Sequence, residues 1–289
     1  MCVLDYLTNT RYGRGLAYAD IDVSSFMAGA DSCDETVTIP APLTNTTGSS
    51  GNYYLPWAGG FTVPNLDRIP TYRPDQGDSE TSVPRLTCNI PLDTGKEVLE
   101  NVQLLLDAMR GTLPYVNGKY TLKIEEAETS VMSLTEDDIV GNLSVSGGDH
   151  SQRINRATIK FLNGSAKNFK PDQASWPKLD SDQYSTYLTE DQNEVLHRTF
   201  DIPSITDFYQ AEDMAEVLVR DSRNTLTVSG EFQPRALRLV PGDVIDLTDS
   251  ELSYSAKKFR VSTVSMNLDT LMVSLTLRAY DESVYTWST

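Results

Sequence analysis

Few residues of this chain have the types and spacing that catalysis or metal binding requires. Neither of its two histidines, His150 and His197, has another histidine at helical or strand spacing. We therefore expect both to be surface residues rather than a general base or a metal ligand. The sequence contains no Gly-x-Ser-x-Gly nucleophile elbow and no phosphate-binding glycine loop followed by lysine.

Acidic side chains are the next candidates, because paired carboxylates serve as the acid and the nucleophile of glycosidases. The adjacent ones are Glu125-Glu126, Glu136-Asp137-Asp138 and Glu212-Asp213. Nothing in the sequence sets a separation between two carboxylates, and no calcium loop of alternating Asp and Asn with a central Gly occurs. We interpret these groups as solvated charges. The sequence therefore predicts a protein that is not an enzyme, with no catalytic residues, no cofactor-binding residues, no metal-binding residues and no cofactor.

The three cysteines, Cys2, Cys33 and Cys88, do not form a disulfide framework. Their number is odd, which suits a reducing compartment, and no Cys-x-x-Cys spacing suggests zinc. We expect each to be a small buried apolar residue.

The chain is acidic throughout, with a formal net charge of -17 shared between its two halves. Such a surface disfavours tight binding to phosphate backbones, which depends on Lys and Arg. The charge either maintains solubility or lines a surface past which DNA slides without adhering. No apolar run reaches the roughly 18 residues that span a bilayer, and the N-terminus lacks the basic and apolar regions of a signal peptide.

The first 125 residues predict an α+β unit. A short helix is expected within residues 20–35, capped by Asp22 or Ser24. A longer helix is expected from Thr94 to Arg110, capped by Asp93 or Thr94 and stopped by Gly111. Asn117-Gly118 between two apolar runs then predicts a hairpin that ends near residue 124.

A long surface loop is predicted from Thr36 to Val83, because small and polar residues dominate there. Several aromatic residues interrupt it: Tyr53, Tyr54, Trp57, Phe61 and Tyr72. We expect them to pack back on the domain or to contact another subunit rather than to bind a ligand.

Residues 126–289 predict a second, strand-rich unit. A strand is expected from Arg156 to Leu162, followed by a polar excursion or long hairpin over residues 163–193. A helix is expected over residues 206–223, capped by Thr206. Four further strands are predicted at residues 225–232, 244–248, 259–266 and 271–280, with a turn at Pro241-Gly242 and a loop at residues 267–270. Together they suggest a small antiparallel barrel or sandwich with one helix laid against it.

Several motifs occur in an order that resembles the tail-tip (J-like) hub proteins of long-tailed bacteriophages. They are Asp5-Tyr6-Leu7-Thr8-Asn9-Thr10-Arg11-Tyr12-Gly13, Ile21-Asp22, Cys33-Asp34, Pro84-Arg85-Leu86-Thr87-Cys88-Asn89, Asn155-Arg156-Ala157 and Leu239-Val240-Pro241-Gly242-Asp243-Val244-Ile245. The predicted helices and hairpin fall in the same order, so the resemblance covers most of the chain. Within it, we interpret Tyr6, Arg11, Tyr12 and Gly13 as scaffold of the first unit.

The resemblance implies a structural protein of the virion, located at the phage tail tip and assembled in the host cytoplasm. The family's fold is α+β and strand-rich, with hub domains built from a tube-like antiparallel β-barrel and a packed helix. Three chains form a ring that closes the distal end of the tail tube. The implied partners are two further copies, the distal tail protein, the tape-measure protein, the tail fibres and transiting DNA bound without sequence specificity. Membrane insertion by this segment is not expected.

The chain also departs from the family pattern. It begins inside that pattern and stops after the second unit, so an upstream hub domain and fibre-like C-terminal modules are expected from another segment or protein. The excursion at 36–83 is longer than the family's short link. Two other functions stay open: a carbohydrate-binding or depolymerase module using Trp57, Tyr53, Trp176 and Tyr184, and an unrelated acidic binding module.

Overall fold

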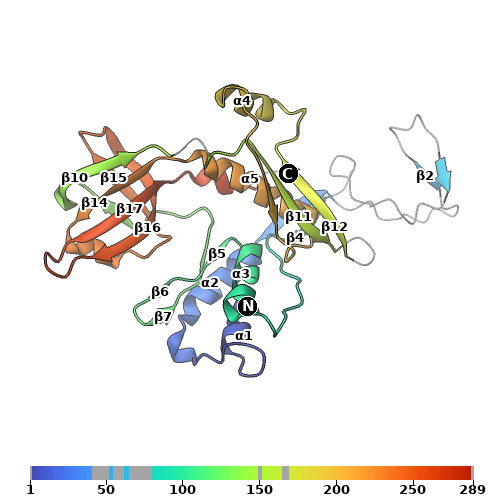
Figure 1. The fold of residues 1–289 in the computed structure, drawn as a ribbon, viewed down its shortest axis with the longest axis horizontal. Helices are drawn as coiled ribbons and strands as arrows, with labels where there is room; N and C mark the ends of the chain where they lie inside the picture. The colour runs from blue at the N-terminus through green and yellow to red at the C-terminus, as the bar shows by residue number, and fades with distance from the viewer. Residues whose placement is uncertain are drawn as a thin grey trace.

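The computed structural model describes residues 2–40, 52–54, 62–64, 80–148, 152–164 and 169–287. Figure 1 shows three neighbouring parts. The N-terminal residues form a helical unit, a three-stranded sheet with the longest helix lies beside it, and the C-terminal strands form a curled sheet at one end of the molecule. The helices are α1 (Cys2–Thr8), α2 (Val23–Cys33), α3 (Val98–Ala108), α4 (Asp182–Glu190) and α5 (Phe208–Arg223).

The first unit packs α1, α2 and α3 around one hydrophobic core. Its buried residues include Val3, Tyr6, Leu7, Ile21, Phe26, Leu86, Val102, Leu105, Leu106, Met109, Leu122 and Ile124. Two short strand pairs follow α3: β5 (Gly111–Thr112) with β8 (Lys123–Ile124), and β6 (Tyr115–Val116) with β7 (Lys119–Tyr120). The predicted hairpin is confirmed: Asn117 and Gly118 both have positive φ, 52° and 81°, as a tight type I′ turn requires.

The ends of the first two predicted helices differ from the expectation. α2 starts after Asp22, whose side chain accepts a hydrogen bond from the Ser24 hydroxyl and caps no backbone N–H. α3 starts at Val98 rather than Thr94, because Asp93 closes its own turn by accepting from the Gly95 N–H at 2.8 Å. Gly111 does not stop α3, which ends at Ala108 and is followed by strand β5.

The predicted loop from Thr36 to Val83 was wrong at both of its ends. β1 (Thr36–Pro40) pairs antiparallel with β4 (Glu80–Pro84) as a ribbon. Tyr53 and Tyr54 lie in β2 (Asn52–Tyr54), which pairs with β3 (Thr62–Pro64). Trp57, Phe61 and Tyr72 lie outside the described residues.

The central unit is a three-stranded sheet covered by α5. β11 (Arg156–Asn163) pairs antiparallel with β12 (Lys170–Trp176) and parallel with β13 (His197–Asp201). The stretch predicted as an excursion contains β12 and also α4, whose Ser181 cap accepts a hydrogen bond from the Tyr184 N–H. α5 begins two residues after the predicted Thr206 cap. Asp207 caps it instead, accepting from the N–H groups of Tyr209 and Gln210.

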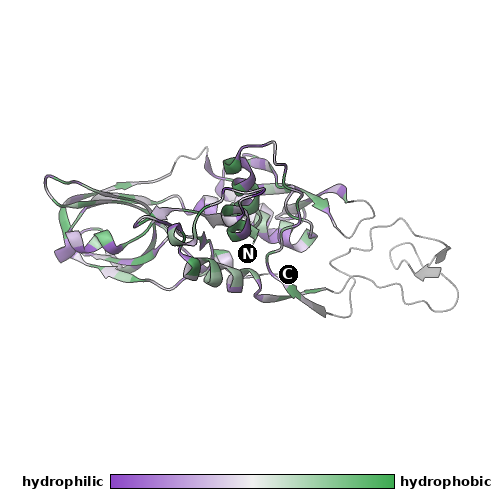
Figure 2. Cartoon of the chain, turned by 90° about the horizontal axis from the view of Figure 1, so that it is seen from below, coloured by the Kyte–Doolittle hydropathy of each residue, from purple (hydrophilic) through white to green (hydrophobic). Residues whose placement is uncertain are grey.

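The C-terminal strands form a six-stranded curled sheet, called the half-barrel here (Figure 2). Its order is β10 (Ile139–Ser146), β14 (Thr227–Phe232), β17 (Val273–Ala279), β16 (Tyr254–Met266), β15 (Val244–Asp249) and β9 (Met132–Leu134). All neighbours are antiparallel except β9 and β15. The last predicted strand had Leu271, Val273, Leu275 and Leu277 alternating on one face. Val273, Leu275 and Leu277 are buried in the core as predicted, whereas Leu271 precedes β17 and is 53% exposed. Four predicted strands therefore exist, with bounds that differ by a few residues.

The helix predicted over residues 206–223 packs on a different sheet from the one expected. The apolar face of α5 packs on β11 and β12 of the central sheet, and not on the half-barrel. The fold class is confirmed: the protein is α+β and strand-rich, with a curled, mainly antiparallel sheet. Within the described residues, no helix is long and apolar enough to cross a membrane.

Candidate functional site

Residues Pro84–Asn89 form a segment, called the strap here, that contacts the first unit, helix α5 and the C-terminal end of the chain. The Arg85 N–H donates to the carbonyl of Glu35 at 2.8 Å. Its buried guanidinium donates from Nη1 to Glu35 Oε2 at 3.0 Å and from Nη2 to the Tyr285 carbonyl at 2.5 Å. One side chain thereby connects residues 50 and 200 positions away, which makes the strap a structural junction.

The next residues of the strap bind α5. Gln210 Oε1 accepts from both the N–H and the hydroxyl of Thr87, at 3.1 and 2.9 Å. Gln210 Nε2 donates to the carbonyls of Thr87 and Ala108, at 3.0 and 2.9 Å. Asn89 Nδ2 donates to the Thr206 hydroxyl at 3.0 Å. The Gln210 amide is therefore satisfied by two elements at once, and its position specifies how α5 meets the first unit.

A buried ion pair lies beside this amide. Arg110 Nη1 is 2.6 Å from Asp213 Oδ2, and both side chains are only 5% exposed. Arg85 Nη2 lies 3.9 Å from the other oxygen of Asp213. α5 thus has an apolar face toward β11 and β12 and a polar face, bearing Gln210 and Asp213, toward the first unit.

In the opening motif, Tyr6 and Gly13 pack within the first unit, whereas Arg11 and Tyr12 are exposed. Tyr6 is buried and its hydroxyl accepts a hydrogen bond from Asn101 Nδ2 at 2.9 Å. The Tyr12 hydroxyl donates to Asp5 at 2.5 Å. The chain folds back on α1 through the Arg14 N–H, which donates to the Tyr6 carbonyl at 3.1 Å. This turn places Gly13 against the C-terminal end of α1.

Gly13→Ala is expected to destabilise the first unit by about 1–3 kcal/mol, because a Cβ has no room there. An ideal Cβ on Gly13 would lie 1.8 Å from the backbone oxygen of Tyr6 and 2.9 Å from that of Asn9. Both neighbours are backbone, so neither can rotate away. Urea denaturation measures the loss. Gly147→Ala is the matched control, since a Cβ there meets nothing within 4 Å; equal effects of the two changes would contradict the steric explanation.

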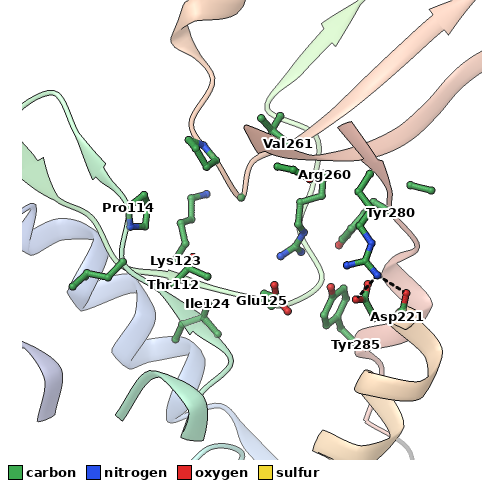
Figure 3. A pocket seen from close by; sticks show the side chains of 16 residues that line it. Thr112, Pro114, Lys123, Ile124, Glu125, Asp221, Arg260, Val261, Tyr280 and Tyr285 are labelled. Carbon is green, nitrogen blue, oxygen red and sulfur yellow. Dashed lines mark hydrogen bonds and ion pairs between the residues drawn. The ribbon is translucent and has the colours of Figure 1, made fainter. Parts of the chain in front are cut away.

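A cavity of about 430 Å³ lies where the half-barrel meets the first unit and α5 (Figure 3). Figure 3 shows Arg260 and Glu125 extending into it, with Tyr280 and Tyr285 beside them. The Arg260 guanidinium lies 5.0 and 5.2 Å from the centres of these two rings. Its Nη2 donates to the carbonyl of Glu126 at 3.0 Å. This charged boundary between the half-barrel and the other two parts is called the seam.

The seam continues as a group of linked charges. Lys123 Nζ lies 2.9 Å from Asp243 Oδ1 and 3.4 Å from Glu128 Oε2. Burial is the largest single influence and opposes the charge of Lys123, but Asp243 and Glu128 together outweigh it and raise the pKa of the ammonium. Burial raises the pKa of the Glu125 and Glu128 carboxyls, opposed by Arg260 and Lys123 respectively. Gly242, with φ 100°, makes the turn that brings Asp243 to Lys123.

The candidates for chemistry are dispersed over the fold. His197 is exposed, as predicted, and its Nε2 lies 2.9 Å from the Thr158 hydroxyl; His150 lies outside the described residues. Of the acidic groups, Asp213 is paired as above and Asp138 is buried, 3.2 Å from Arg235. The interpretation of all these acids as solvated charges was therefore wrong for Asp138 and Asp213, which are buried and paired.

The cysteines differ from one another. Cys33 and Cys88 are partly buried in the first core, and burial raises the pKa of each thiol to about 11. Such thiols are unreactive at neutral pH. Cys2 is exposed, so its prediction as a buried apolar residue was wrong. α1 starts at Cys2 and turns Val3, Tyr6 and Leu7 to the core instead.

The aromatic residues proposed for carbohydrate binding are packing residues where the structure describes their side chains. Trp176 lies 6.2 Å from the Tyr187 ring and beneath the Arg220 guanidinium, at 5.4 Å. Tyr184 is buried on α4. Across the described residues, no cluster of three His, Cys, Asp or Glu side chains could hold a metal ion.

Residues 97–264 match the family described as "Putative phage tail protein" (Phage-tail_3). This range covers more than half of the chain. The chain belongs to this family of phage tail proteins. It therefore has the context of a virion component.

One curated relative extends the match to almost the whole sequence. The baseplate hub protein pb3 of Escherichia phage T5 is 24% identical over 285 residues, which is 98% of this chain. The match covers 27% of pb3, so this phage tail protein spans about a quarter of the length of that relative.

A solved structure shares the fold. A chain from the virion of a native gene transfer agent particle aligns with a TM-score of 0.53 and 12% identity, over 66% of this chain and 41% of that one. A tail protein from Neisseria meningitidis MC58 aligns at a TM-score of 0.45 and 13% identity, over 70% of this chain and 60% of that one. The first of these likenesses shows the fold; the second is too low to support an argument.

Sequence reasoning found the strap but missed the residues that it binds. The sequence could have indicated Gln210 and Asp213, because both are polar residues among the apolar residues of α5. Such residues need partners when buried. The identity of those partners, Thr87 and Arg110, more than 100 positions earlier in the chain, depends on the tertiary fold.

Proposed function

We propose that this phage tail protein is a structural component of the tail-tip baseplate hub. The observation that carries the proposal is the alignment with T5 pb3, a baseplate hub protein, over 98% of this chain. The geometry supports it, because motif residues such as Arg85 and Thr87 form packing junctions rather than a catalytic constellation. The function then resides in interfaces, and the protein is not an enzyme.

The assembly that we propose is a homotrimeric ring at the distal end of the tail tube. It would organise the distal tail protein, the tape-measure protein and the tail fibres, and leave a channel for DNA ejection. The net charge of -17 supports the channel, since like charges keep a transiting duplex from adhering. The place of action would be the tail tip of the virion, after assembly in the host cytoplasm.

We further propose that residues 1–125 and 126–289 are separate units. The hydrophobic clusters support this division: the buried members of the first-unit cluster end at Ile124, and those of the other clusters begin at Leu134. The strap and the Lys123–Asp243 pair would then be contacts between the two units, of which the second contains two hydrophobic clusters, one in the half-barrel and one in the central sheet.

The decisive experiment measures the mass of the purified assembly and locates the chain in a reconstruction of the intact tail. We expect three copies per particle and density for the half-barrel around the tube axis. A stable monomer in solution, together with no density for this fold at the tail tip, would contradict the proposal.

A further inference from the structure

The turn that follows α1 carries exposed side chains that packing within the chain does not explain. Residues 6–19 contain two arginines, Arg11 and Arg14, and no Asp or Glu, in a chain with 41 acidic residues among 289. Both arginines are exposed, and among the described residues neither guanidinium makes a hydrogen bond or an ion pair. The turn therefore places two uncommitted positive charges on the surface of an acidic protein.

Exposed tyrosines extend this surface. Tyr12 lies between the two arginines, and Tyr18 of the short helix η1 (Tyr18–Asp20) is 64% exposed. The chain after η1 joins the hairpin, since the Asp22 N–H donates to the Tyr120 carbonyl at 2.9 Å. Tyr115 lies opposite Tyr120, with ring centres 4.9 Å apart, and is 63% exposed. Figure 1 shows the chain between α1 and α2 and the hairpin β6–β7 along the lower edge of the molecule, away from the central sheet.

The exposed cations and rings of these segments are together called the Arg/Tyr surface. Its members are Arg11, Tyr12, Arg14, Tyr18, Tyr115 and Lys119.

Hydrogen bonds hold the turn in one conformation. Asn9 Oδ1 accepts from the N–H groups of Arg11 and Tyr12, at 2.9 and 3.3 Å. The Leu16 N–H donates to the Leu7 carbonyl at 2.9 Å, which fixes the return of the chain along α1. A partner thus meets a backbone that is already ordered, and preorganisation of this kind lowers the entropic cost of binding.

The composition of the Arg/Tyr surface is that of a protein–protein contact. The centres of such interfaces are enriched in Tyr and Arg and depleted in Asp and Glu, and Tyr and Arg are among the residues whose removal weakens binding most. Duplex DNA is a poorer fit, because binding to it requires many cations and the whole chain has a net charge of -17. The partner that fits best is an acidic protein surface.

A second copy of the chain supplies the complementary charge. On the half-barrel, Asp137, Glu231 and Glu251 are exposed and have no ion-pair partner among the described residues. Copies with a net charge of -17 repel one another unless cations of one copy lie against acids of the next. The Arg/Tyr surface and these acids lie on different parts of the fold, so a contact between them is head-to-tail, the type that can close a ring.

We propose that the Arg/Tyr surface binds a second copy of this chain. Arg11 and Arg14 lie against acidic side chains of that copy, and the contact covers the rings of Tyr12, Tyr18 and Tyr115. The inference rests on the proposed hub function, and it adds the surface through which neighbouring copies of the ring meet.

The double variant Arg11→Glu and Arg14→Glu tests the inference, with sedimentation over a range of protein concentrations as the readout. Both side chains are exposed and unpaired, so we expect the variant to fold and to keep its melting temperature. We expect it to assemble only at a concentration on the order of 100-fold higher than the wild type, at about tenfold for each reversed charge. Tyr18→Ala, which changes no charge, is expected to raise that concentration about tenfold.

Lys170→Glu with Lys178→Glu is the matched control, because it makes the same change in net charge at two exposed cations outside the Arg/Tyr surface. It is expected to assemble like the wild type. The inference is overturned if the two double variants weaken assembly equally, or if the arginine variant assembles as readily as the wild type. It is also overturned if the wild type binds a short DNA duplex that the arginine variant does not bind, since the partner would then be nucleic acid.

The outcomes separate this inference from the hub function. A wild-type chain that stays monomeric in solution overturns the inference, and the reconstruction of the intact tail then decides the hub function on its own. A wild-type trimer that the arginine variant also forms overturns the inference and leaves the hub function standing.

Discussion

Asp213→Ala is expected to lower the free energy of unfolding by about 3–5 kcal/mol. The substitution leaves the Arg110 guanidinium buried without its partner, which lies at 2.6 Å. It also removes the second-nearest carboxylate to Arg85, which lies 3.9 Å from Arg85 Nη2. A guanidinium cannot lose its charge at accessible pH, so the cost is not relieved by titration. Equilibrium denaturation in urea, followed by tryptophan fluorescence, measures the loss.

Two comparisons make this result interpretable. Asp269→Ala removes a carboxylate from an exposed loop and is expected to change stability by less than about 0.5 kcal/mol. The double change Arg110→Met and Asp213→Leu removes both charges and is expected to recover much of the loss, because apolar residues can replace a buried pair. If the double variant is less stable than Asp213→Ala, the unpaired charge of Arg110 is not the cause of the lost stability.

Phe259→Ala is expected to cost about 3–5 kcal/mol and to act on the half-barrel. Phe259 is 0% exposed in the half-barrel core, and its ring centre lies 5.7 Å from that of Tyr254. Its removal leaves a cavity in the half-barrel core. That core is a separate hydrophobic cluster from the core of the first unit. Hydrogen exchange should therefore accelerate in β14–β17 while the amides of α1 and α3 keep their protection.

Phe169→Ala is the matched control for this prediction, since the Phe169 side chain is 55% exposed. It is expected to change stability by less than about 0.5 kcal/mol. Loss of protection in α1 and α3 together with the half-barrel would show that the chain unfolds as one cooperative unit. That outcome would contradict the division at residue 125.

Local patterns predicted the elements whose structure depends on neighbours in the sequence. Asn117-Gly118 predicted its turn because both residues tolerate positive φ. The alternation of Val273, Leu275 and Leu277 predicted the buried face of β17. The helix caps were predicted less well: Ser, Thr and Asp cluster before α3 and α5, and tertiary bonds decide which one caps. Thr206 accepts from Asn89, which leaves Asp207 to cap α5.

Local sequence patterns predicted the candidate sites only in part as well. The order of the motifs indicated a hub-like tail protein, and the family match confirms a phage tail protein. The role of Arg85 did not follow from its motif, because its guanidinium binds Glu35 and Tyr285, which are far away in the sequence.

The sequence by itself determined the family context, the α+β class, the hairpin and the main strands of the half-barrel, because these depend on composition, residue order and local periodicity. Only the tertiary structure decided that α5 covers the central sheet, that the strap binds the polar face of α5, and that a charged seam separates the half-barrel from the rest. Those features arise from contacts between residues far apart in the sequence, such as Thr87 with Gln210 and Lys123 with Asp243. Their energies depend on burial and on the partner, and neither is encoded in a local pattern.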